Sequence, residues 1–196
     1  MIILDIEATG VDPDKHSILS IGAIDLDRPE LIFNEECRVW DEARIDPAAL
    51  VVNGYTEEQV KDSTKQTDEQ LVKNFFAWLE QREDRTIAGQ NPAFDMGYLR
   101  ATSKRYGINF PLAYRTIDQH SLVYFHMIRR GLVPPTEHHR SAINSDFIMS
   151  YVGIPAEPKP HLAINGATWE AEALHRLMYE KPLLTKFEEY KIPWLK

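Results

Sequence analysis

The 196-residue sequence contains a single cysteine, Cys37, so it cannot form an internal disulfide. Cys37 lies in the strand-like run LIFNEECRVW, where we expect a buried structural thiol rather than a nucleophile. No apolar run approaches the roughly 20 residues that a membrane-spanning helix needs. The segment MIILDIEATG has no basic region before its apolar run and reaches a carboxylate at position 5. It therefore predicts neither a signal peptide nor a membrane anchor, and we expect a cytoplasmic location.

Basic residues are also scarce, with 22 Lys and Arg against 30 Asp and Glu and a formal net charge of -8. Such a chain does not coat nucleic acid by neutralising phosphates, because that requires a surplus of cations. An enzyme that acts at one strand end is still compatible with this charge, since bound metal ions can cancel clustered carboxylates.

The order of apolar runs predicts the fold class. MIILDI is typical of a central buried strand, and HSILSIGAIDLD and PELIFNEECRVW follow it after the turn-rich segments DPDK and DRPE. These runs predict an antiparallel meander of three strands. Beyond it, helical periodicity alternates with the short strands RTIAGQ and YRTID. We therefore expect an α/β domain over residues 1–180 with a mixed sheet flanked by helices, and a tail, 181–196, that packs on the domain or on a partner subunit.

Three acids, Asp5, Glu7 and Asp95, lie at positions where the sequence pattern is compatible with metal binding. Asp5 and Glu7 are two residues apart at the end of the first strand, so their side chains share one face. Two carboxylates in a buried strand repel each other, and a shared cation relieves the repulsion; oxygen ligands suit Mg²⁺ or Mn²⁺. The alternative is a strand end where both acids face water. Asp95 falls in the first turn of a predicted helix, where acids are favoured even without a metal.

The segments LDIEATG, GQNPAFDMGYL and HLAINGATWEAEAL, in this order and spacing, resemble the three motifs of the DEDDh 3'-to-5' exonucleases. The resemblance covers most of the chain, roughly residues 1–179. It implies a ribonuclease H-like fold with a mixed five-stranded sheet. It also implies hydrolysis of phosphodiester bonds at the 3' end of single-stranded DNA or RNA with two Mg²⁺ or Mn²⁺ ions, releasing nucleoside monophosphates.

The resemblance also assigns roles to individual residues. Asp5, Glu7 and Asp95 match the family's first three metal-binding acids, and His161 matches its general base. Four further residues match positions that contact the terminal nucleotide, although turn chemistry and core packing explain them equally well: Thr9, Gly10, Asn91 and Phe94.

The third motif departs from the family pattern. The fourth acid is expected five residues after the histidine, and this chain has Gly166 there, next to Asn165. Glu170 follows one helical turn later on nearly the same azimuth, and helical side chains lean toward the N-terminus. We therefore expect Glu170 to lie over the space that Gly166 leaves empty. The predicted helix has an apolar face that includes Glu170 and excludes Glu172 and Arg176. That face is formed by Ala163, Ala167, Ala171, Leu174, Leu177 and Met178.

Two hypotheses follow for the site and three for the protein. Either Glu170 replaces the missing acid, directly or through a metal-bound water, or it pairs with a basic residue such as Arg100 or lies at a solvated edge of the apolar face, and the site holds one metal or none. The protein is accordingly an active exonuclease, or a catalytically impaired module that binds 3' ends or a polymerase. A third and weaker alternative is a small-RNA exoribonuclease that works as a homodimer.

Overall fold

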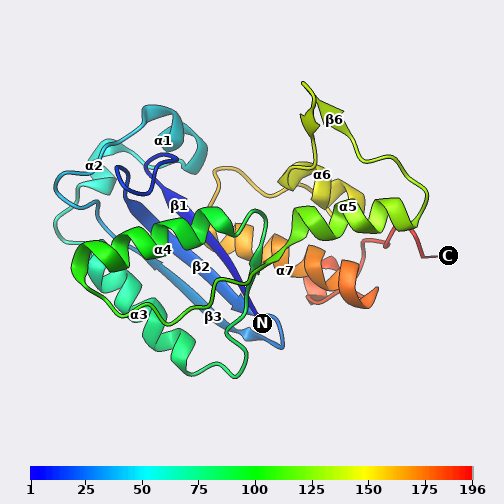
Figure 1. Cartoon of the computed structure of the whole chain (residues 1–196), viewed down its shortest axis with the longest axis horizontal. Coiled ribbons are helices and arrows are strands. Elements are labelled where there is room, and N and C mark those ends of the chain that lie inside the picture. The colour runs from blue at the N-terminus through cyan, green and yellow to red at the C-terminus, as the bar shows by residue number, and fades with distance from the viewer. Residues whose placement is uncertain (196) are drawn as a thin grey trace.

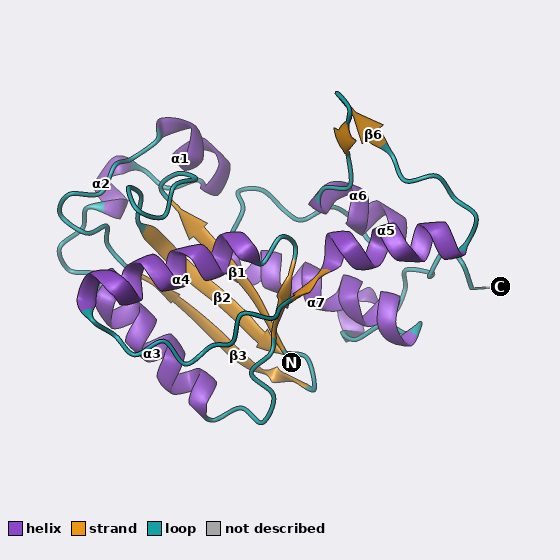
Figure 2. Cartoon of the chain, in the orientation of Figure 1, coloured by secondary structure: helices purple, strands orange, loops and turns teal. Residues whose placement is uncertain are grey.

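The computed structural model describes residues 1–195, and a five-stranded mixed sheet forms its centre (Figures 1 and 2). The strand order is β3-β2-β1-β4-β5. The strands are β1 (Ile2–Ala8), β2 (Ile18–Asp25), β3 (Arg28–Glu36), β4 (Ile87–Gly89) and β5 (Ile117–Asp118). The first three form the predicted antiparallel meander, and β4 and β5 run parallel to β1. The predicted α/β class and mixed five-stranded sheet are confirmed.

The pairing of β1 is unequal along its two edges. β1 pairs with β2 along its whole length, from Ile2 to Ala8. It pairs with β4 only at Ile2 and Ile3, because β4 ends at Gly89. The second half of β1, which carries Asp5 and Glu7, therefore has one edge open to side chains from the helices.

Helices cover both faces of the sheet, with α3 (Asp68–Glu80) and α4 (Ala93–Tyr106) in front and α7 (Ala163–Tyr179) behind in Figure 1. The even-numbered residues of β1 pack against α3 and α4, and Ile3 packs on the other face against α7. Helix α3 is capped by Thr67, whose side chain accepts from Gln70 N. Because both faces of β1 are covered, the continuous apolar run of this strand is explained.

The first turn of α7 contacts β2 at Gly22. A Cβ atom at Gly22 would lie 2.2 Å from the carbonyl oxygen of Ala163, so no larger residue allows this approach. Gly22 is also the β2 partner of Asp5. The close contact therefore sets the start of α7 beside Asp5.

Two short helices connect β3 to α3 at the end of the sheet where β1 finishes (Figure 1). They are α1 (Pro47–Asn53) and α2 (Glu57–Val60). The side chain of Asp46 caps α1, and Asn53 Nδ2 donates to the carbonyl oxygen of Ala8, which ties α1 to the end of β1.

A second apolar cluster lies beside the sheet, between α7, α5 (Gln119–Arg129) and α6 (Ser145–Val152). The short 3-10 helix η1 (Thr185–Phe187) closes it from the C-terminal segment. Between α5 and α6 the chain forms the small hairpin β6 (Thr136–Glu137) and β7 (Arg140–Ser141).

Glu172 and Arg176 lie outside the face of α7 that packs on the sheet, as expected, but they are not exposed. Both side chains are completely buried, and Arg176 Nε donates to Glu172 Oε1 at 2.5 Å. Helix α7 packs against the sheet on one side and against α6 and the C-terminal segment on the other, so it buries two faces rather than one. Met178, expected on the apolar face, is 40% exposed because the last turn of α7 extends past these neighbours.

None of the helices formed by residues 1–195 combines the length and the apolar character needed to traverse a lipid bilayer.

Candidate active site

Four acids predicted from the sequence converge at the open edge of β1. Asp5 and Glu7 come from β1, Asp95 from the first turn of α4, and Glu170 from the second turn of α7. Burial raises the pKa of Asp5 well above its usual range, and the charges of Glu170, Asp95 and Glu7 raise it further. Each acid therefore lies close enough to destabilise the ionised form of Asp5.

The pKa values of Glu7 and Asp95 shift in the same direction. Burial raises the pKa of Glu7 to about 7, against a lowering by His161. Burial also raises the pKa of Asp95, while the backbone N–H groups of Asp95 and Ile6 oppose the shift. Asp95 reaches Ile6 because β4 leaves that part of β1 unpaired. Among residues 1–195, Asp95 Oδ1 is a buried oxygen without a hydrogen-bond partner.

Glu170 contacts the end of β4 rather than a basic side chain. Its side chain is buried, and Oε2 accepts from Gln90 N at 3.0 Å. The pairing with Arg100 considered from the sequence is wrong, because the Arg100 guanidinium stacks over Tyr114, 4.2 Å from the ring centroid. Burial raises the pKa of Glu170 well above its usual range, and Asp95 raises it further.

The space beside Gly166 is occupied. A Cβ atom at Gly166 would lie 2.1 Å from Asp5 Oδ2, so the Asp5 carboxylate fills the position expected to be empty. Glu170 therefore does not lean over Gly166 as expected; it is directed at Gly89, where a Cβ atom would lie 2.9 Å from Glu170 Oε2. The glycine lets α7 approach the first acid of β1 directly.

His161 lies beside this group just before α7. Its ring is 31% exposed, and Nδ1 lies 3.0 Å from Glu157 Oε2. The charge of His161 lowers the pKa of Glu7, so the ring is close to that carboxylate. Sequence reasoning missed Glu157, because a glutamate four residues before a histidine in a proline-rich loop carries no pattern of its own.

A cavity of about 330 Å³ opens next to Glu7, and Gly10 and Phe94 line it. Its far wall is α1, which sequence reasoning did not include in the site. The lining residues from α1 are Ala48, Ala49, Val52 and Asn53. The cavity has one acid of the site at its edge and apolar walls, as expected of a place for a sugar and base.

Thr9 and Asn91, the other two residues matched to the nucleotide, do not line this cavity. The Thr9 hydroxyl donates to the carbonyl oxygen of Arg44 and accepts from Ser17 N, and Thr9 is fully buried. Asn91 has a positive φ of 55° and is exposed; its N–H donates to Asp118 Oδ1. For Thr9, turn chemistry accounts for the whole side chain.

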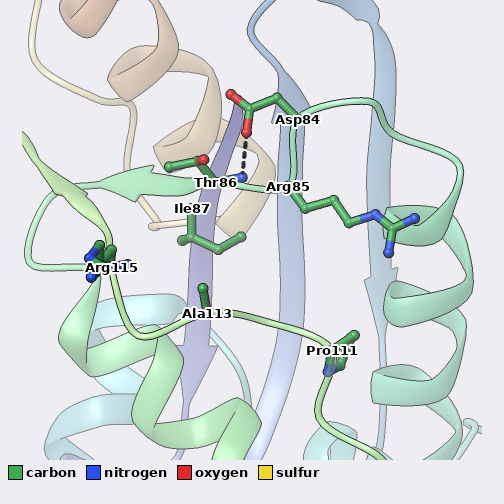
Figure 3. A pocket seen from close by; sticks show the side chains of 7 residues that line it. All are labelled: Asp84, Arg85, Thr86, Ile87, Pro111, Ala113 and Arg115. Carbon is green, nitrogen blue, oxygen red and sulfur yellow. Dashed lines mark hydrogen bonds between the residues drawn. The ribbon is translucent and has the colours of Figure 1, made fainter.

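A second cavity, of about 360 Å³, lies at the opposite end of β4 (Figure 3). The Arg85 side chain extends away from Ile87 and Ala113 in this view, and the Asp84 carboxylate accepts from Thr86 N. No acid of the predicted site lines this cavity.

Comparison with known proteins identifies the family. The sequence profile of the RNase T exonuclease family matches residues 2–168. The chain belongs to this exonuclease family. The nuclease domain of 3'hExo, a DEDDh family member solved with bound rAMP, superposes with a TM-score of 0.71 at 17% identity and covers 93% of both chains. Cell-death related nuclease 4 (CRN-4) has a TM-score of 0.72 at 18% identity, covering 97% of this chain and 65% of that one. Escherichia coli exonuclease I with a dA16 oligonucleotide has a TM-score of 0.67 at 18% identity, covering 91% of this chain and 40% of that one.

Among curated relatives, the chain matches DNA polymerase III PolC-type from Thermotoga maritima at 27% identity over 104 residues. PolC-type polymerase of Bacillus cereus matches at 23% identity over 107 residues. The matches cover 53% and 55% of this chain but only 7% of each polymerase. The family match covers residues 2–168, and within it position 166, where the third motif leads us to expect an acid, is a glycine.

The donor set suits a hard divalent cation. Asp5, Glu7, Asp95 and Glu170 offer only carboxylate oxygens, which are the ligands that Mg²⁺ and Mn²⁺ prefer. Burial raises the pKa values of Asp5, Asp95 and Glu170, and Asp95 Oδ1 has no hydrogen-bond partner, so a cation among these groups would favour their ionised forms. Within residues 1–195, no three His, Cys, Asp or Glu side chains are arranged to hold a metal ion as they stand.

Proposed function

We propose that the protein is a DEDDh-type 3'-to-5' exonuclease that hydrolyses phosphodiester bonds at the 3' end of single-stranded DNA or RNA and releases nucleoside monophosphates. The observation that carries the proposal is the convergence of four acids from three separate elements, at a strand edge that β4 leaves open. Like charges are gathered at such a point when function requires them, because their mutual repulsion opposes folding.

The residues of the site have three roles in this proposal: metal binding, proton transfer and nucleotide binding. Asp5, Glu7 and Asp95 would hold Mg²⁺ or Mn²⁺, and Glu170 takes the place of the fourth acid that Gly166 cannot supply. When bound, the cation would neutralise these carboxylates and the phosphate. His161 accepts the proton of the attacking water through an unprotonated ring nitrogen. Gly10 and Phe94, together with α1, hold the terminal nucleotide in the cavity beside Glu7.

The activity test uses matched DNA and RNA oligonucleotides labelled at the 5' end, with Mg²⁺, with Mn²⁺ and with a chelator. We expect products that shorten stepwise from the 3' end, release of mononucleotides, and no reaction with the chelator. His161→Ala should slow the reaction by about 10²- to 10⁴-fold, the usual contribution of a general base. Cleavage that starts at the 5' end, or undiminished cleavage by His161→Ala, would contradict the proposal.

The metal site can be tested by thermal unfolding, without measuring nuclease activity. Adding Mn²⁺ should raise the melting temperature of the wild-type protein, because a ligand that binds the folded state stabilises it. Asp5→Asn should raise the melting temperature of the metal-free protein by removing one repelling charge, and should abolish the shift caused by Mn²⁺. An unchanged Mn²⁺ shift in Asp5→Asn would show that the ion binds elsewhere.

The alternative function, a nuclease-like module that binds 3' ends without cleaving them, is favoured by Gly166, which supplies no acid where the third motif leads us to expect one. It predicts binding of a 3'-terminal oligonucleotide with neither mononucleotide release nor a Mn²⁺-dependent rise in melting temperature. Association with a polymerase gains support from the PolC-type relatives, in which the matching segment is part of a polymerase chain. The homodimer and the cytoplasmic location stay predictions.

A further inference from the structure

Glu157 is a buried acid in a loop that is otherwise mostly exposed. It lies between α6 and α7, where Pro155, Ala156 and Pro158 are all exposed, yet only 7% of its side chain is accessible. Its Oε2 atom lies 3.0 Å from His161 Nδ1. In the part of the chain that the structure describes, its second oxygen, Oε1, is buried without a hydrogen-bond partner. In a solvated surface glutamate the side chain would be accessible, and water would satisfy both carboxylate oxygens.

Two contacts fix the position of His161, one to α1 and one within the loop. The backbone N–H of His161 donates to the carbonyl oxygen of Val52 at 3.2 Å, which ties the histidine to the end of α1. Glu157 then holds the ring itself. Because Val52 also lines the cavity beside Glu7, the backbone contact places His161 at the boundary between the acids and the expected nucleotide.

The chemistry of this pair decides what the ring can do. An ionised carboxylate can only accept a hydrogen bond, so the contact requires the hydrogen of a neutral imidazole to be on Nδ1. Nε2 then carries a free lone pair and can accept a proton, and the carboxylate stabilises the imidazolium that results. The opposite tautomer would leave Nδ1 and the carboxylate as two acceptors facing each other.

We propose that Glu157 is the positioning residue of His161, fixing its orientation and its Nδ1–H tautomer so that Nε2 faces the water at the site. This inference rests on the proposed function, in which His161 is the general base. It goes beyond the three sequence motifs, since Glu157 lies outside all of them. Glu157 itself contacts neither the nucleotide nor the reacting atoms in this role.

The first test reads the tautomer directly in the full-length, metal-free protein. Protein labelled with ¹⁵N-histidine is examined by long-range ¹H–¹⁵N correlation, with His161→Gln to assign the signal, at a pH where titration shows the ring to be neutral. We expect His161 of the wild type to be protonated on Nδ1 and that of Glu157→Ala to shift to the Nε2–H form. Glu189→Ala, which removes an exposed glutamate, serves as the charge-matched control and should leave the tautomer unchanged. An Nε2–H ring in the wild type, or a ring unchanged by Glu157→Ala, would overturn the inference.

The second test separates positioning from binding and from folding. Glu157→Ala should lower kcat by about tenfold to a hundredfold, because a misoriented base loses part of its contribution, while KM for the oligonucleotide stays within about twofold. Glu157→Gln should recover part of kcat, since its amide oxygen can still accept from Nδ1–H. Melting curves establish that each variant is folded.

The two proposals fail in different ways. If the wild type cleaves and Glu157→Ala keeps the wild-type kcat, the positioning role is wrong and the exonuclease assignment stands. If the wild type cleaves nothing with any divalent cation, the exonuclease assignment fails, and the tautomer measurement alone decides whether Glu157 orients His161.

Discussion

Gly166 stands where the third motif leads us to expect an acid, and its neighbour Asp5 explains how a glycine fits there. The carboxylate of Asp5 occupies the space that a side chain at position 166 would need. An aspartate there would force Asp5 to turn and would add another negative charge to the cluster. The acid lost at Gly166 is compensated, in our proposal, one turn further along α7 by Glu170.

This exchange can be tested with Glu170→Ala and its double variants. Glu170→Ala should lose the stabilisation by Mn²⁺ and most of the Mn²⁺-dependent cleavage. Gly166→Asp combined with Glu170→Ala should restore part of both, because the acid returns to the family position. The measurements are melting temperature against Mn²⁺ concentration and the rate of mononucleotide release.

Gly166→Ala combined with Glu170→Ala is the matched control, since it adds a Cβ atom without a charge. Equal recovery in both double variants would mean that the acid at position 166 contributes nothing. Full Mn²⁺-dependent activity in Glu170→Ala alone would show that Glu170 is not the substitute.

At the level of residues, local spacing predicted only part of the site. Asp5 and Glu7 were identifiable because the two-residue period of a strand puts them on one face. Glu157 was not, because its burial and its contact with His161 depend on how an irregular loop docks against α1. The turn role of Thr9 likewise depends on Arg44, which is far from it in the sequence.

At the level of elements, α7 connects the site to the second apolar cluster. Glu170 points to the end of β4, whereas Glu172 accepts from the backbone N–H groups of Leu183 and Leu184 in the C-terminal segment. The Arg176 guanidinium donates to the carbonyl oxygens of Val152, Phe187 and Tyr190. One helix thus carries an acid of the site on one face and a buried ion pair on another.

Replacing Arg176 by methionine should strongly destabilise the fold. The change leaves Glu172 buried without its cation and strips the donor from three carbonyl oxygens, so we expect a loss of about 3–5 kcal/mol in the free energy of unfolding. Equilibrium urea denaturation measures it.

Lys73→Met provides the control, since it also breaks an ion pair with a glutamate four residues away on a helix, but at the surface. Its effect should be below about 1 kcal/mol. Similar losses in the two variants would show that burial does not set the strength of the Arg176 pair.

Periodicity predicted the helices more reliably than their environments. The 3.6-residue repeat of α7 identified the face that packs on the sheet, because that face consists of alanine and leucine. It placed Glu172 and Arg176 on the other side because they are polar. No local pattern reveals that a later segment of the same chain covers that side.

At the scale of the whole molecule, the sheet with its helices and the second cluster share α7. Phe187 is 2% exposed and packs edge-to-face on Trp169, with ring centroids 5.0 Å apart. The C-terminal segment therefore completes a core whose other walls are α5, α6 and α7. The boundary at residue 180 predicted from the sequence remains a prediction, although the contacts across it are extensive.

Phe187→Ala should lower the free energy of unfolding by about 3–5 kcal/mol, the usual result of emptying a buried aromatic site. Phe125→Ala, at a position 63% exposed on α5, should change it by no more than about 0.5 kcal/mol. Far-UV circular dichroism and tryptophan fluorescence, followed together during unfolding, should give one shared transition. Two separate transitions would show that the second cluster unfolds independently of the sheet.

The contact between Gly22 and Ala163 has an electrostatic consequence for the site. The amino end of an α-helix carries roughly half a unit of positive charge, from backbone N–H groups that lack a helical partner. Because Gly22 lets this end of α7 rest on β2 next to Asp5, the backbone itself offsets part of the negative charge there before any cation arrives. A glycine on a strand that carries none of the acids thereby helps to determine how tightly they can be held together.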